Sequence, residues 1–204
     1  MHPIIKESIN GGISYRDYRE LVKQLADEHS NTGIEKTEAL ANYTKLNDRR
    51  MRRWDKTIKI SKETQQKISE FNQKMTLLII TESWCGDAAH VIPALNKIAE
   101  LNPNIDVKLV LRDENLELMD MFLTKGGRAI PKVIMIDDET GAVLSTYGPR
   151  PSEASSYVNR FVAKNGSLTP EFKEDLQHWY NGDKGQNIIN DVIEILSQLE
   201  PICQ

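Results

Sequence analysis

The sequence contains few cysteines, no long apolar run and no strong excess of charge of either sign. Only 2 cysteines occur among 204 residues, far apart in the chain, so the disulfide framework of a small secreted protein is not expected. A membrane-spanning helix requires about 18 consecutive apolar residues, and this sequence has no such run. The formal net charge of −4 is small and negative, which argues against a nucleic-acid partner.

The beginning of the sequence also lacks a targeting signal. Residues 1–7, Met-His-Pro-Ile-Ile-Lys-Glu, do not show the basic stretch and then the apolar stretch of a secretory signal. We therefore expect a protein of the reducing cytoplasm with no membrane partner. At 204 residues the chain is long enough for a sizeable core, and no internal repeat or low-complexity linker divides it.

The most informative segment is Trp-Cys-Gly-Asp-Ala at residues 84–88, between a predicted strand and a predicted helix. Residues 75–82 form an apolar run of strand length, and apolar side chains then recur at helical spacing over residues 91–99. Cys85 is therefore expected at the start of a helix. Unpaired backbone N–H groups and the helix dipole favour a thiolate there, so we expect the pKa of Cys85 to lie below the free-thiol value of about 8.5.

A second cysteine is missing from this segment. A two-cysteine redox site needs its other thiol three residues after the first, where this chain has Ala88. Cys85 is thus predicted to be a nucleophile without its own resolving thiol. The plain alternative is a buried structural residue, because free cysteines are often buried as small apolar side chains. Cys203, near the end of the chain, is a further candidate resolving thiol.

Four features, taken in order, resemble the thioredoxin family. Trp-Cys-Gly at 84–86 matches the opening of the family's active-site turn, and Pro93 matches the proline of its active-site helix. Arg-Ala-Ile-Pro at 128–131 resembles the segment that carries the family's cis-proline opposite the cysteine. Gly148 resembles its groove glycine. The resemblance spans residues 74–166.

The resemblance implies an α/β fold of the thioredoxin type, with a central mixed sheet flanked by helices. We divide the chain into a helical N-terminal extension packed on the core (1–72), a thioredoxin-like core (73–166) and C-terminal helices (167–204). Within the extension, Ser14 and Ser61 stand where helix N-caps are expected, each before a run with helical spacing.

The resemblance also implies a peptide-binding groove beside Cys85. The residues expected to shape it are Trp84, Gly86, Ile130, Pro131 and Gly148. In the family, the residue before the cis-proline pairs through its backbone with an extended peptide, and that residue is Ile130 here. The ordinary alternative is a trans proline at the first position of a strand. The family's buried strand acid is replaced by Ile79, which argues against ordinary disulfide reduction.

Two polar residues follow Cys85 closely. Asp87 is either a helix-start acid stabilised by the helix dipole or a proton acceptor or substrate contact, and its charge should raise the pKa of the thiol. His90 completes a Cys, Asp and His set, but three potential ligands without a fourth are a weak zinc signal. We expect no metal or other cofactor, and a histidine at the surface or the groove edge. An iron–sulfur cluster shared with an external thiol, as in monothiol glutaredoxins, stays open as an alternative, although their Cys-Gly-Phe-Ser motif is absent.

One dense basic cluster occurs in the chain. Because acidic residues flank it, a solvated or salt-bridged helix face is expected there rather than a nucleic-acid site. The cluster consists of Arg49, Arg50, Arg52 and Arg53, with Asp48 and Asp55 beside it.

The sequence supports two functions. In the first, Cys85 attacks a disulfide or an oxidised thiol, and a protein thiol or a low-molecular-weight thiol from outside releases the mixed disulfide. This would be a monothiol thiol-disulfide oxidoreductase. In the second, the chain is a non-catalytic peptide- or protein-binding module and Cys85 takes no part. Ala88 and Ile79 favour the second function, whereas the intact turn favours the first. The sequence indicates neither the substrate nor the oligomeric state.

Overall fold

A four-stranded mixed sheet forms the centre of the protein, whose computed structural model describes residues 1–199. The strand order is β2-β1-β3-β4. The strands are β1 (Met75–Thr81), β2 (Ile105–Leu111), β3 (Lys132–Asp137) and β4 (Val143–Tyr147). β1 runs parallel to β2 and antiparallel to β3, which is antiparallel to β4. Every residue of β1 and β3 is buried, as expected for central strands.

The register of β1 and β3 positions the turn that carries Cys85. Ile80, near the end of β1, lies opposite Lys132 at the start of β3. The turn that follows β1 and the loop that precedes β3 therefore lie at the same end of these two strands. This brings Cys85 and Pro131 together although they are far apart in the sequence.

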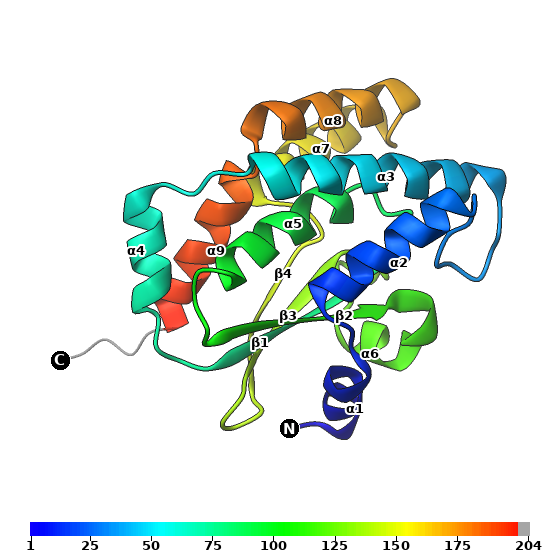
Figure 1. The fold of residues 1–204 in the computed structure, drawn as a ribbon. Helices are drawn as coiled ribbons and strands as arrows, with labels where there is room; N and C mark the ends of the chain where they lie inside the picture. Colours follow the sequence, from blue (N-terminus) through cyan, green and yellow to red (C-terminus); the bar gives the residue numbers. More distant parts are fainter. Residues whose placement is uncertain (200–204) are drawn as a thin grey trace.

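Helices cover both faces of the sheet, so the predicted mixed sheet flanked by helices is confirmed. α5 packs against β2, and α3 packs across α5 (Figure 1). α1 and α6 lie together on the opposite side of the sheet. The helices are α1 (Pro3–Gly11), α2 (Tyr15–Asp27), α3 (Glu38–Thr57), α4 (Lys62–Glu70), α5 (Ala88–Ala99), α6 (Leu116–Met121), α7 (Ser152–Asn165), α8 (Pro170–Asp183) and α9 (Gln186–Leu199), with a short 3-10 helix at Arg112–Glu114.

The N-terminal helices share one apolar core with the sheet. The side chain of Ser14 caps α2, accepting from Asp17 N at 3.2 Å, and that of Ser61 caps α4 in the same way; both predicted caps are confirmed. Tyr18 and Trp54 from these helices are buried in the same cluster as the strands and α9. The helices thus stabilise the sheet by burying apolar surface.

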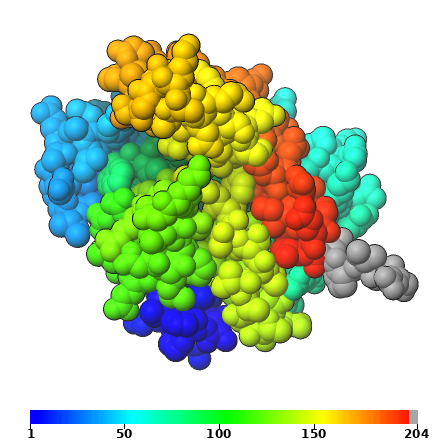
Figure 2. All heavy atoms as spheres, turned by 180° about the vertical axis from the view of Figure 1, so that it is seen from behind, coloured from blue at the N-terminus to red at the C-terminus, as the bar shows by residue number. Residues whose placement is uncertain are grey.

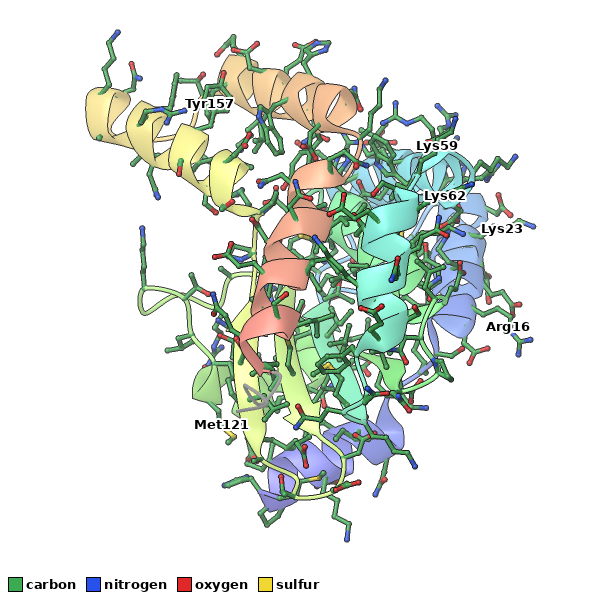
Figure 3. The ribbon with its side chains drawn as sticks, turned by 90° about the vertical axis from the view of Figure 1, so that its left-hand side faces the viewer. Arg16, Lys23, Lys59, Lys62, Met121 and Tyr157 are labelled. Atoms are coloured by element: carbon green, nitrogen blue, oxygen red, sulfur yellow. The ribbon has the colours of Figure 1, made fainter. Side chains whose placement is uncertain are left out.

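α7 and α8 form a pair with a small core of their own. Phe172, Leu176 and Tyr180 recur every four residues along α8 and pack with Val158 of α7. Tyr157 of α7 lies between the two helices (Figure 3), with its ring centre 4.7 Å from that of Phe172 and the two rings tilted by 46°. The pair lies beyond α3, on the side away from the sheet (Figure 1).

From behind, the segment after α6 reaches toward α7 (Figure 2). Lys125 Nζ donates to Asn159 Oδ1 at 3.4 Å. The helix α7 therefore also contacts the segment that follows α6. Within residues 1–199, none of the helices combines the length and the apolar character that crossing a bilayer would require.

Candidate functional site

The segment that carries Cys85 is a short turn between β1 and α5. The backbone N–H of Cys85 donates to Glu82 O at 3.1 Å, and the Cys85 carbonyl accepts from Ala89 N at 3.3 Å. Cys85 therefore precedes the first turn of α5, which begins at Ala88. Ala88, in the position of a resolving thiol, is 2% exposed.

The Cys85 thiol is buried and neutral. Its side chain is 8% exposed, and its Sγ donates to the carbonyl oxygen of Ile130 at 3.3 Å. Burial, followed by the negative charge of Asp87, raises the pKa of Cys85 to about 12. Hydrogen bonds from the backbone N–H groups of Asp87 and Ala88 oppose this rise without cancelling it. The predicted pKa below the free-thiol value is therefore wrong, because desolvation outweighs the helix-start effect.

Asp87 is a nearly buried carboxylate with two partners from distant elements. Arg150 Nη2 binds its Oδ2 at 2.8 Å, and the Tyr180 hydroxyl of α8 donates to its Oδ1 at 2.9 Å. Burial raises the pKa of Asp87, while the charge of Arg150 and the bond from Tyr180 oppose the rise. The Asp87 side chain makes no cap bond to α5; its partners are Arg150 and Tyr180.

The prediction that His90 lies at the surface or the groove edge is wrong: its side chain is buried in the interior and does not line the groove beside Cys85. Trp54 Nε1 donates to His90 Nδ1 at 2.8 Å, which leaves the proton of the neutral ring on Nε2, 2.8 Å from Gln177 Oε1. The ring stacks on Tyr180 at 4.1 Å, and burial lowers the pKa of His90 to about 3. Both ring nitrogens are therefore occupied. Among the residues that the structure describes, no group of His, Cys, Asp and Glu could hold a metal ion.

The loop before β3 packs directly against the cysteine. The Ile130–Pro131 peptide bond is cis, and both residues are buried. The Ile130 carbonyl, expected to pair with a peptide, accepts the Cys85 thiol instead. Gly148 adopts a φ of +100°, and a Cβ there would lie 2.4 Å from the Pro131 carbonyl oxygen, so only glycine fits.

A groove of about 690 Å³ opens beside Cys85, between α3 and α8. Cys85 is on its wall with Trp84, Gly86 and Asp87. α3 contributes Leu40, Tyr43 and Arg50 to its other walls. Leu168 comes from just before α8, Leu176 and Gln177 come from α8, and Arg150 comes from the loop after β4.

The predicted site residues do not all lie on this groove. Trp84, Cys85, Gly86 and Asp87 meet on the groove between α3 and α8. Ile130 and Pro131 do not line it, and Gly148 lines a different hollow beside Arg150 and Asp191. A larger hollow of about 790 Å³, between α1, α6 and β2, contains no cysteine or histidine.

The residues that set the state of the site were not found by sequence reasoning. Arg150, Gln177 and Tyr180 lie far along the chain from the turn. The apolar spacing along α8 predicts a buried stripe but not the helix against which it docks. No local sequence motif therefore predicts that Arg150, Gln177 and Tyr180 contact the turn.

Glu82 is a second buried acid that the sequence analysis did not single out. Its Oε1 accepts from the backbone N–H of Asp113 at 2.9 Å, and Thr32 Oγ1 donates to its Oε2. Burial raises the pKa of Glu82. Nearby, the Arg112 guanidinium lies 5.0 Å from the centre of the Trp84 ring, a cation–π contact that fixes one wall of the groove.

The basic cluster on α3 is not uniformly solvated. Arg52 pairs with Asp48, and Arg53 donates to Asn181 of α8 and lies over the Trp54 ring. Arg50 instead lies half-buried on the groove. The second cysteine, Cys203, lies outside the described residues.

Comparisons with known proteins agree with the fold. A family model described as Thioredoxin matches residues 33–165. The crystal structure of a protein of unknown function from Pseudomonas aeruginosa is similar to this chain with a TM-score of 0.68 and 17% identity, covering 96% of this chain and 98% of that one. The crystal structure of an HIV epitope-scaffold is similar with a TM-score of 0.58 and 18% identity, covering 91% and 99% of the two chains. No curated protein matches. At such identities the two structures support the fold alone.

Proposed function

This chain belongs to the thioredoxin family, whose model matches more than half of it, and we propose that it exchanges thiols and disulfides through one cysteine, Cys85. The thioredoxin-like α/β fold predicted from the sequence is confirmed by the family match. The single-cysteine chemistry is the proposal. One observation carries it: in the family's turn, the Cys85 sulfur faces the loop of Pro131, and the Cys85 residue also lines an open groove.

The exchange proceeds in two steps. The Cys85 sulfur, after losing its proton, attacks one sulfur of a partner disulfide R–S–S–R′. The Cys85–S–S–R bond forms as the partner's bond breaks, and R′S⁻ leaves and takes up a proton. A second thiol from outside, R″SH, then attacks the mixed disulfide, which yields R–S–S–R″ and restores Cys85. The outside thiol supplies the electrons because Ala88 provides no resolving sulfur.

The environment of the Cys85 thiol determines the expected rate of thiol-disulfide exchange. A neutral thiol that donates to Ile130 O must lose both its proton and this bond before it attacks. With a pKa raised to about 12, we expect slow exchange of one partner at a time rather than fast disulfide reduction.

A non-catalytic binding module is the second candidate. The observation in its favour is the same raised pKa of Cys85, together with a side chain only 8% exposed. In this function the groove between α3 and α8 would hold a peptide or protein partner without covalent chemistry.

Insulin reduction by dithiothreitol separates single-thiol exchange from dithiol reduction. The Cys203→Ser protein should accelerate it little, and Ala88→Cys in that background should accelerate it more, since it restores the second thiol. Ile79 should keep the gain modest, because the strand lacks a proton-transfer acid. Cys85→Ser is the matched control and should be inactive. Robust turnover by the Cys203→Ser protein would contradict the single-thiol proposal.

A further inference from the structure

Apolar side chains line much of the groove beside Cys85, and most of them come from outside the active-site turn. α3 contributes Leu40 and Tyr43, the approach to α8 contributes Leu168, and the turn contributes Trp84. Its volume of about 690 Å³ lies within the roughly 300–1,000 Å³ of small-molecule sites. An apolar body of low molecular weight would therefore fit it.

Arg50 is a charged group of this groove that forms no ion pair among the described residues. Within residues 1–199 it forms no salt bridge, and its hydrogen bond there is from Nη1 to the neutral amide oxygen of Asn47, at 3.0 Å. Burial and the neighbouring charge of Arg53 lower the pKa of Arg50. The charge of Asp87, which forms no salt bridge with Arg50, opposes this fall. Because the guanidinium is half-buried and has no carboxylate in ion-pair contact, an added anion would be favourable.

Arg50 lies directly beside the active-site turn. A Cβ on Gly86 would be 3.6 Å from Arg50 Nη1, so the guanidinium faces the backbone of the residue that follows Cys85. An anion bound to Arg50 would therefore place the rest of its molecule along the turn, next to the thiol.

The other charges of the groove leave it with an excess of positive charge. Asp87 is already bound by Arg150 and Tyr180. Arg150 Nε is buried and has no hydrogen-bond partner among the described residues. On α8, Lys173 and Glu174 also line the groove, with opposite charges. The groove is thus lined by three cationic side chains, Arg50, Arg150 and Lys173, against the two carboxylates of Asp87 and Glu174.

We propose that this groove binds low-molecular-weight carboxylates with an apolar body, and that Arg50 binds the carboxylate. The inference deepens the proposed function, on which its covalent part rests: the favoured partners of Cys85 are thiols and disulfides that carry a carboxylate. A guanidinium binds a carboxylate through two parallel N–H···O bonds, which gives selectivity over a neutral molecule of the same shape.

Binding without covalent chemistry is measured in the Cys85→Ser, Cys203→Ser protein. Isothermal titration calorimetry compares 2-naphthoate with 2-naphthalenemethanol, its neutral counterpart. We expect tighter binding of 2-naphthoate, weakened about 10- to 100-fold by Arg50→Gln. Arg50→Lys should restore part of the affinity, and Arg49→Gln, an exposed arginine one residue away on α3, should change nothing. Equal affinity for the two probes, no binding, or equal effects of Arg49→Gln and Arg50→Gln would overturn the proposal. Thermal melts of both variants show whether the fold is kept.

The covalent consequence is measured in the Cys203→Ser protein with two aromatic disulfides. The dianionic 5,5′-dithiobis(2-nitrobenzoate) should modify Cys85 faster than neutral 4,4′-dithiodipyridine, after correction for their rates with free cysteine, and Arg50→Gln should remove this preference. Arg50-dependent 2-naphthoate binding with no reaction of Cys85 would support the carboxylate groove and contradict the thiol-exchange function. Reaction with both disulfides without an effect of Arg50→Gln would support the function and overturn the carboxylate groove.

Discussion

The Cys85 thiol lies between groups that favour its neutral form and groups that favour its thiolate. Burial and the Asp87 carboxylate act on one side, and the backbone N–H groups of Asp87 and Ala88 and the Arg150 charge act on the other. With a pKa of about 12, the thiolate fraction at pH 7 is on the order of 10⁻⁵. The sequence predicts the position of Cys85 before a helix, but the burial comes from loops and helices that no local pattern reveals.

Replacement of Asp87 by Asn should make Cys85 more reactive. The change removes the like charge beside the thiol and leaves Arg150 uncompensated, so the pKa of Cys85 should fall by about half a unit to one unit. In the Cys203→Ser background, timed iodoacetamide labelling at pH 8 followed by mass spectrometry should show a rate about 3- to 10-fold higher. The exposed Asp106→Asn is the matched control. Equal rates for Asp87→Asn and the parent protein would show that the carboxylate charge does not act on the thiol.

At the scale of elements, short-range patterns predict well what lies inside one helix or strand. The apolar run that becomes β1 and the caps at Ser14 and Ser61 are local features, and the structure has them. α1 was not predicted, because its N-cap residue His2 makes no side-chain cap bond that a polar pattern would reveal. The docking of α8 on α5 depends on pairs such as His90 and Gln177, which have no common sequence signature.

The contact between α8 and the turn should depend on the Tyr180 hydroxyl. Tyr180→Phe removes its bond to the buried Asp87 carboxylate, and a hydrogen bond to a charged group contributes about 1.5–3 kcal/mol. The free energy of unfolding should fall by a similar amount in urea denaturation, and amide exchange should increase more over residues 170–183 than over the sheet.

Tyr157→Phe is the control for this prediction. Tyr157 also lies between α7 and α8, and its hydroxyl forms no hydrogen bond within residues 1–199. It should therefore change stability and exchange little. If the two variants behaved alike, the Tyr180–Asp87 bond would not be what fixes α8.

At the scale of the whole molecule, the groove is a product of tertiary structure. α3, the turn after β1 and α8 are separated in the sequence and meet only in the fold (Figure 1). The resemblance to the thioredoxin family predicts the core, its turn and the proline segment, because these are local motifs. It does not predict that the helical additions cover the turn and create a new groove with Arg50 on its wall.

The stability of the whole fold should depend on His90 between pH 6.5 and 3. Its folded pKa of about 3 lies below its ordinary value of 6.5, so the unfolded chain binds the extra proton first as pH falls. The contribution of neutral His90 is fully present above pH 6.5 and is lost progressively toward pH 3. His90→Gln should be less stable at pH 7 but lose less stability on acidification, by up to a few kcal/mol. Urea denaturation across this pH range measures it, with the exposed His178→Gln as control; parallel curves for wild type and His90→Gln would refute it.

The central claim, single-thiol exchange through Cys85, is tested most directly by trapping the mixed disulfide. The folded Cys203→Ser protein is incubated with glutathione disulfide, and its intact mass is followed by mass spectrometry. We predict slow addition of one glutathionyl group, mapped to Cys85, absent in Cys85→Ser and reversed by reduced glutathione. No adduct on the folded protein, with an adduct on the same protein unfolded in guanidinium chloride, would contradict the claim and leave a non-catalytic binding module.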